Sequence, residues 1–288
     1  MIIARFAALS GSPASVCVIL ALSAWASGAP AQHAPIKVIL DTDIGTDIDD
    51  AWALALAMTS PEFELMAVTI TDGNTTARAR VACKLLHTAD RGDVPIAVGR
   101  PTPPPDGIDY QFTWAEDFTA KRPVIQPAAQ LIVDTVRRFP NEVTLIGVGP
   151  LQNVADALRL EPRLPKLLKR VVLMSGSIRA SAWSPAPVPE WNVVRATADA
   201  QLVYAAGFPL TTVPLDSTTY VRLKDEERER LPARATPLTR SLEALYRLWQ
   251  ATSEARPRTG DVSMKSAAAA CDANSRSTVS RSSSSPPH

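Results

Sequence analysis

Histidine and cysteine are scarce in this sequence of 288 residues, which contains three of each. The histidines, His33, His87 and His288, are so placed that a catalytic triad based on histidine is not expected. The cysteines and histidines nowhere have the spacing of a zinc site. Cys83 lies in a helical pattern and is predicted to be a small buried apolar residue. Other side chains must therefore carry any chemistry.

The sequence also lacks an excess of charge of either sign. Its 30 basic and 29 acidic residues leave a net charge of +1. Proteins that bind nucleic acid or an anionic membrane surface usually have a marked basic excess, so neither partner is predicted here. With 46% hydrophobic residues, the composition is typical of a soluble globular protein.

Large apolar residues are missing from the end of the chain. From Arg258 to His288 there is no Leu, Ile, Phe, Trp or Tyr, and serine becomes frequent. Such a segment cannot bury much apolar surface, so residues 257–288 are predicted to form a low-complexity, disordered tail. The abrupt change after Arg256 suggests a frame change or truncation near residue 258 that removes the last elements of the fold.

The first 31 residues have the pattern of a secretory signal peptide. Arg5 is followed by an apolar stretch at residues 16–25 and by small residues that end in Ala29-Pro30-Ala31. The apolar stretch is shorter than a membrane span needs, although an uncleaved anchor is the alternative. Cleavage after Ala31 predicts an exported protein, periplasmic in a bacterium, with no membrane contact once the signal is removed.

Apolar runs typical of strands alternate with helical patterns along the rest of the chain. The first strand and helix lie within residues 36–58. Further strands are predicted at residues 64–70, 94–98, 143–148, 171–175 and 210–215. Helices are predicted at 75–89, 128–138, after Pro150, and at 197–206, 224–231 and 237–252. This alternation indicates an α/β domain over residues 36–256, with an open, mostly parallel sheet and helices on both faces.

Two long segments interrupt this alternation. Residues 100–126 contain several prolines and the aromatic residues Tyr110, Phe112 and Trp114. Their length suggests a loop over a functional site, and a disordered proline-rich loop is the alternative. Residues 176–189 form the second irregular segment.

Acidic residues crowd into ten positions after the first predicted strand. They are Asp41, Asp43, Asp47, Asp49 and Asp50. Like charges this close raise one another's pKa unless water, donors or a cation offsets the repulsion. One or two could serve only in turns or helix caps. Because open α/β sheets bind ligands where strands end, the group favours a polar-substrate or metal site, with calcium or magnesium preferred by oxygen ligands.

The aspartate-rich segment resembles the opening motif of the inosine-uridine-preferring nucleoside hydrolase family. That motif is D-x-D-x-G-x-D-D-A after a strand, and this chain has two extra residues around Asp47. The matching residues are Asp41, Asp43, Gly45, Asp49, Asp50 and Ala51. Three later segments also resemble the family, in its order: residues 71–74 (TDGN), residues 145–153 (LIGVGPLQN), and residues 172–176 followed by 190–192 (EWN). The resemblance covers about residues 36–220.

The resemblance implies a Rossmann-like fold that hydrolyses the N-glycosidic bond of a nucleoside with Ca²⁺ as cofactor. It implies Asp43 as general base and metal ligand, Asp50 as a second ligand, and the backbone carbonyl of Val148 as a third. Asp41 would support these groups from behind. The residues implied to bind ribose hydroxyls are Asp49, Asn74, Glu190 and Asn192. The family is commonly dimeric or tetrameric, which allows a homo-oligomer.

The sequence departs from the family near its end. The family takes a last metal ligand from an H-D-P or F-D-P segment, and the nearest candidate here is Asp261 in T-G-D-V. Loss of a carboxylate ligand would weaken calcium binding, so a non-catalytic periplasmic nucleoside- or sugar-binding protein, or an inactive remnant, is one alternative. A haloacid-dehalogenase-like phosphatase is another, because Asp41-Thr42-Asp43 resembles its D-x-D motif, although its later G-D-x-x-x-D motif is absent.

Overall fold

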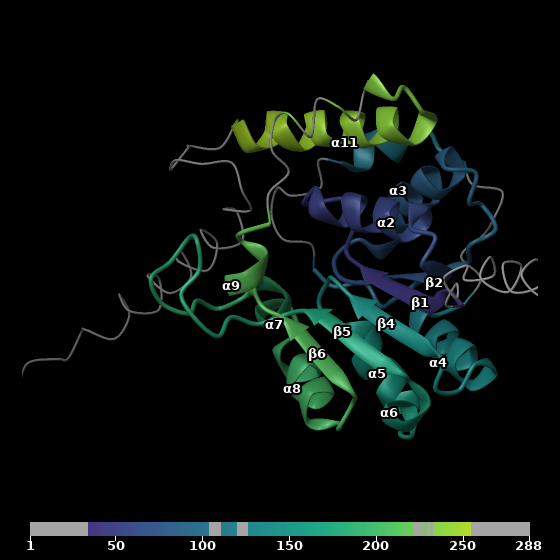
Figure 1. The fold of residues 1–288 in the computed structure, drawn as a ribbon, viewed down its shortest axis with the longest axis vertical. Helices are drawn as coiled ribbons and strands as arrows, with labels where there is room; N and C mark the ends of the chain where they lie inside the picture. Colours follow the sequence, from purple (N-terminus) through teal and green to yellow (C-terminus); the bar gives the residue numbers. More distant parts are fainter. Residues whose placement is uncertain are drawn as a thin grey trace, which may run out of the picture. The chain divides into compact units, whose positions relative to one another are not determined.

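Six strands form one parallel sheet, shown in Figure 1. The computed structural model describes residues 34–103, 111–119, 126–221 and 233–254, together with Glu226 and Arg230. The strands are β1 (Ile36–Thr42), β2 (Phe63–Ile70), β3 (Ile96–Val98), β4 (Val143–Gly147), β5 (Arg170–Met174) and β6 (Leu210–Val213). They lie in the order β3-β2-β1-β4-β5-β6, and every pairing between them is parallel. The predicted parallel α/β sheet is therefore confirmed.

Helices cover both faces of the sheet (Figure 1). One face carries α2 (Asp49–Thr59), α3 (Thr75–Thr88) and α11 (Pro237–Glu254), and the other carries α4 (Ala128–Arg138), α5 (Gln152–Leu160), α6 (Leu164–Leu167) and α8 (Thr197–Ala205). Successive residues of β1 face opposite cores: Val38 and Leu40 pack with the first group of helices, and Ile39 packs with the second. A strand buried on both faces needs apolar residues on both, which explains the unbroken apolar run at residues 38–40.

Several short elements were not predicted. They are the 3₁₀ helix η1 (Phe112–Ala115) and the helices α6, α7 (Trp191–Arg195) and α9 (Leu215–Thr218). Helices of four or five residues span about one turn, so they have no apolar period to detect. The prediction of a strand to residue 215 was also too long, because β6 ends at Val213 and Leu215 begins α9.

Some predictions concern residues outside the described part of the chain. These are the signal peptide at residues 1–31, most of the helix at 224–231, and the tail at 257–288. Within the described part, every helix is too short or too polar to cross a membrane.

The strand order reverses between β1 and β4. From β1 the chain first adds β2 and β3 on one side and then returns to add β4, β5 and β6 on the other. At the carboxyl ends of the two central strands, Asp41 lies opposite Gly147, and the Val148 backbone N–H donates to the Asp41 carbonyl oxygen at 2.8 Å. Open α/β sheets place ligands at this kind of switch point, and the aspartate-rich segment starts here.

Candidate active site

The chain turns sharply between β1 and α2. Thr42 Oγ1 accepts a hydrogen bond from the Ile44 backbone nitrogen at 3.1 Å and donates to Asp50 Oδ1. Gly45 has a φ of +114°, and a Cβ at this position would lie 2.6 Å from Phe112 Cε1. Glycine is needed here both for its backbone conformation and for the contact with η1. Through this turn, Asp50 in the first turn of α2 lies beside Thr42 at the end of β1.

Asp41 is completely buried behind this turn. Its Oδ1 accepts hydrogen bonds from Thr69 Oγ1 at 2.6 Å and Asn153 Nδ2 at 2.7 Å, while Oδ2 is buried without a partner among the described residues. Burial raises the pKa of Asp41 to about 7, and the nearby charge of Asp43 adds to this effect, although both hydrogen bonds oppose it. Asp41 is therefore a supporting group, fixed between β2 and α5.

Asp43 and Asp50 form the buried part of the acidic cluster, with 7% and 6% of their surfaces exposed. Burial raises the pKa of Asp43 to about 6, against the lowering effect of the Arg78 guanidinium. Burial also raises the pKa of Asp50 well above its ordinary value, and the charges of Asp43 and Asp49 raise it further. Asp49 is exposed as the first residue of α2, yet desolvation of its carboxyl group within the cluster and the charges of Asp47 and Asp43 raise its pKa to about 8, against the effect of the helix dipole.

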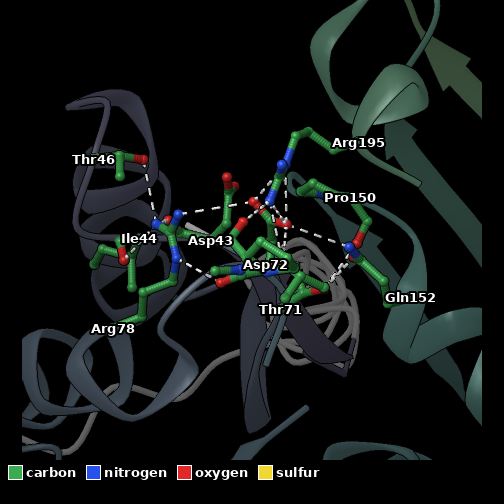
Figure 2. Close-up of polar contacts among 12 residues, drawn as sticks. Asp43, Ile44, Thr46, Thr71, Asp72, Arg78, Pro150, Gln152 and Arg195 are labelled. Atoms are coloured by element: carbon green, nitrogen blue, oxygen red, sulfur yellow. Dashed lines mark hydrogen bonds and ion pairs between the residues drawn. The ribbon is translucent and has the colours of Figure 1, made fainter. Parts of the chain in front are cut away.

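The end of β2 contributes a buried carboxylate with two arginines, which the sequence did not single out (Figure 2). Asp72 Oδ1 accepts from Arg195 Nη2 at 2.8 Å and from Thr102 Oγ1 at 2.6 Å. Arg78 donates through Nε to the Asp72 carbonyl oxygen at 2.8 Å. One signal was available for Arg78, because it shares the apolar face of α3 with Val81, three residues away. A cation at a core position of a helix indicates a buried partner.

Three of the residues predicted to bind ribose make hydrogen bonds within the chain. Asn74 is exposed and its Oδ1 caps α3 by accepting from the Ala77 nitrogen at 3.1 Å. Glu190 is buried and caps α7, with Oε1 accepting from the Asn192 nitrogen at 2.8 Å and Oε2 from the Gly176 nitrogen at 3.0 Å. Burial raises the pKa of Glu190, and these backbone donors oppose the shift.

The carbonyl of Val148 lies within this network. Asn192 Nδ2 donates to the Val148 carbonyl oxygen at 2.9 Å and to the Met174 carbonyl oxygen at 3.0 Å. Gly149 follows so close to the aspartate turn that a Cβ would lie 2.7 Å from Asp43 Oδ1. The structure therefore brings the ends of β1, β4 and β5 together around the predicted metal-binding residues.

The predicted metal ligands are oxygen donors, and most of them lie within the described residues. Within the described ranges, no three acidic, histidine or cysteine side chains converge as a metal-binding group. The predicted set includes only two such side chains there, Asp43 and Asp50, with the Val148 carbonyl as the third donor, and Asp261 lies outside the described residues. These donors are all oxygens and two are carboxylates, which suits a hard divalent cation.

A separate cavity of about 600 Å³ lies beside this site, next to α4 and α5. Its lining includes Arg100, Asp156 and Asn153, and Asn153 also donates to Asp41. None of the residues predicted to bind metal or ribose lines it. The cavity is thus linked to the acidic cluster through Asn153, which lines the cavity and donates to Asp41.

Comparison with known proteins identifies relatives across most of the chain. The family model "Inosine-uridine preferring nucleoside hydrolase" matches residues 38–282. The pyrimidine-specific ribonucleoside hydrolase RihA of Shewanella sp. (strain ANA-3) is 33% identical over 222 residues, which are 72% of this chain and 68% of that protein. The non-specific ribonucleoside hydrolase RihC of Salmonella enteritidis PT4 (strain P125109) is 33% identical over 238 residues, covering 79% and 75%.

Solved structures show the same fold. A plant nucleoside hydrolase, the PpNRh1 enzyme, superposes with a TM-score of 0.67 at 25% identity, covering 77% of this chain and 73% of that one. The purine-preferring ribonucleoside hydrolase from Gardnerella vaginalis superposes with a TM-score of 0.64 at 22% identity, covering 76% and 73%. The second likeness is one of fold alone.

Proposed function

Since this chain belongs to the inosine-uridine preferring nucleoside hydrolase family and is an enzyme that hydrolyses the N-glycosidic bond of ribonucleosides, we propose that the acidic cluster after β1 is its catalytic centre. One observation carries this assignment. Asp43 and Asp50 are buried together at the switch point of the sheet, beside the end of β4. Buried carboxylates with raised pKa values, at the place where such sheets bind ligands, are typical of active sites.

Asp43 is the proposed general base. A base works best when its pKa lies near the working pH, and burial brings the pKa of Asp43 to about 6. It would take a proton from the attacking water as the bond between base and ribose breaks. With a cation bound to keep them ionised, Asp49 and Asp50 would place further negative charge beside the oxocarbenium-like transition state.

Metal dependence is general in this family, and we propose Ca²⁺ as the ion. The ligands would be carboxylates of Asp43 and Asp50 and the carbonyl of Val148, with Asp261 as the candidate for the last ligand. When bound, the ion would lower the pKa of a water molecule and orient it with the ribose hydroxyls. Asn192 supports this assignment, because its donation at 2.9 Å holds the Val148 carbonyl in place.

The ribose would be bound by Asp49, Asn74, Glu190 and Asn192. Glu190 keeps capacity for this role, since each carboxylate oxygen can accept two hydrogen bonds and Oε1 accepts one from the Asn192 nitrogen. Asp49 is already exposed, so it can contact a ligand without any change in the surrounding structure. Asn74 would have to share Oδ1 between the α3 cap and the sugar, or donate from its amide nitrogen.

Pyrimidine ribonucleosides are the proposed first substrates to test. RihA is pyrimidine-specific and RihC is non-specific, so uridine and cytidine fall within the substrate classes of both relatives. We also propose export to the periplasm, from the signal-like sequence of residues 1–31. Amino-terminal sequencing of protein recovered from a periplasmic fraction should begin at Gln32, and intact Met1 there would contradict cleavage.

Substitution of Asp43 tests the proposed function. The Asp43→Asn variant keeps the side-chain shape but removes the base, so kcat for uridine should fall about 100-fold or more. Asp93→Asn is the matched control, because Asp93 is an exposed acidic residue paired with Arg91. Activity is measured as free base and reducing sugar, with calcium and with chelator. Substrate binding without product in the wild type would favour a binding protein and contradict the proposal.

A further inference from the structure

Arg78 is almost completely buried, with 2% of its surface exposed, and it lies near the start of α3. The hydrogen bonds of its guanidinium group lead to two loops (Figure 2). Nε donates to the Asp72 carbonyl oxygen at 2.8 Å, and Nη2 lies 4.0 Å from Asp72 Oδ2. Nη1 donates to the Asp43 carbonyl oxygen, and also to the Ile44 carbonyl oxygen and Thr46 Oγ1, both at 3.2 Å. One side chain therefore joins the loop after β1 to the loop after β2.

Each loop has a residue with a positive φ. Asp72 has a φ of +58°, in the left-handed region that non-glycine residues rarely adopt, and Gly45 has a φ of +114°, which glycine adopts without strain. A strained residue persists only when its surroundings fix it. Arg78 binds the carbonyl of Asp72, while Arg195 and Thr102 bind its carboxylate. The phenyl ring of Phe112 in η1 lies over the guanidinium, with 6.0 Å between the guanidinium carbon and the centre of the ring.

We propose that Arg78 is the positioning residue of the active site. It holds the backbone at Asp43 in a fixed position relative to the backbone at Asp72. It touches carbonyl oxygens behind the cluster, so its role is to set where the Asp43 carboxylate points. Its guanidinium also places a permanent positive charge within a group of buried carboxylates, whose repulsion would otherwise separate the two loops.

The contacts require arginine in particular. A guanidinium has five N–H donors fixed in one plane, and here they reach acceptors on both loops at once. A lysine ammonium offers a single point of charge on a flexible stem, so it would reach one loop and leave the other unsupported. A lysine, which keeps the positive charge but lacks the guanidinium group, should therefore not substitute for Arg78.

Hydrogen exchange of the backbone amides tests this role without requiring activity. Arg78→Lys and Arg78→Met are compared with Arg80→Met, which removes an exposed arginine from the same helix. Exchange at residues 43–48 and 71–76 should become about tenfold faster or more in both Arg78 variants, since hydrogen bonds to a charged group are lost. Exchange in β4 should match the wild type, and Arg80→Met should leave all these segments unchanged.

The proposal makes a second prediction about kinetics, and this one rests on the proposed role of Asp43. In Arg78→Lys, kcat for uridine should fall at least tenfold with a much smaller change in KM, because the base is displaced rather than the sugar contacts. Exchange at wild-type rates in both loops of Arg78→Lys would overturn the proposal. An equal increase throughout the sheet would also overturn it, by showing a general role in stability. A wild type that exchanges as expected but never cleaves nucleosides would refute the proposed function alone.

Discussion

Replacement of Gly149 by alanine tests how closely the end of β4 approaches the catalytic turn. A Cβ on Gly149 would lie 2.7 Å from Asp43 Oδ1, 2.7 Å from Thr71 Cγ2 and 2.9 Å from the Asp43 backbone nitrogen. The carboxylate could rotate away, but the backbone nitrogen cannot, so the ends of β1 and β4 must separate. Forced overpacking of this kind costs about 1–3 kcal/mol.

Gly92→Ala is the matched control, because nothing lies within 4 Å of a Cβ built there. Replacing a glycine by alanine where the backbone allows it stabilises a protein by about 0.4–1 kcal/mol, through the lower entropy of the unfolded chain. This gain is common to both variants. Urea denaturation should therefore show a difference of about 1–3 kcal/mol in free energy of unfolding between them, with Gly149→Ala the less stable.

Gly149→Ala should also lower kcat, even under conditions where the protein stays folded. Displacing a catalytic group by about 1 Å can lower a rate by about 100-fold, and here the added methyl group contacts both the backbone and the carboxylate of Asp43. The measurement is kcat for uridine at a temperature where both variants are folded. If Gly149→Ala is as stable and as active as Gly92→Ala, the close approach of β4 to Asp43 is wrong.

Two further predictions concern the supports of the fold and the site. Hydrogen bonds from Arg163 and Arg137 lower the pKa of Glu161 to about 2, so its contribution to stability is complete above about pH 4.5 and is lost as the pH falls toward 2. The urea midpoint of Glu161→Gln should therefore depend less on pH across this range, and a slope equal to that of the wild type would refute the assignment. Asn192→Asp replaces the donor to the Val148 and Met174 carbonyls with an acceptor and should cost about 1–3 kcal/mol, while calorimetry should show weaker calcium binding. Unchanged calcium affinity in a folded variant would contradict the role of Asn192 in holding the Val148 carbonyl.

The order of strands and helices could be predicted because it rests on local patterns. A strand buried on both faces needs apolar residues on both, and the centres of β1, β4 and β5 have them, at residues 38–40, 145–146 and 171–173. The start of α2 followed from aspartates suited to a first helical turn, and Gly45 marked the turn before it. Elements of one helical turn, such as α7 and η1, have no such pattern and were missed.

The candidate site could be predicted only where its residues are neighbours in sequence or match a family motif. Asp72 and Arg195 are 123 residues apart and meet because β2 and β5 end at the same edge of the sheet. Gln111 lay in a segment predicted as a loop, yet its side chain is buried and donates to the Thr46 carbonyl at 2.9 Å. Local patterns say nothing about which loops meet, since that depends on strand order and register.

The sequence by itself determined that this protein has a parallel α/β sheet with acidic residues where the first strand ends, because burial and helix dipoles act on neighbouring residues. The tertiary structure alone decided what surrounds those acids. It placed the donors of Thr69 and Asn153 on Asp41, and it placed Arg78 between the loops of Asp43 and Asp72. A buried carboxylate needs such partners, and they come from distant segments that only folding brings together.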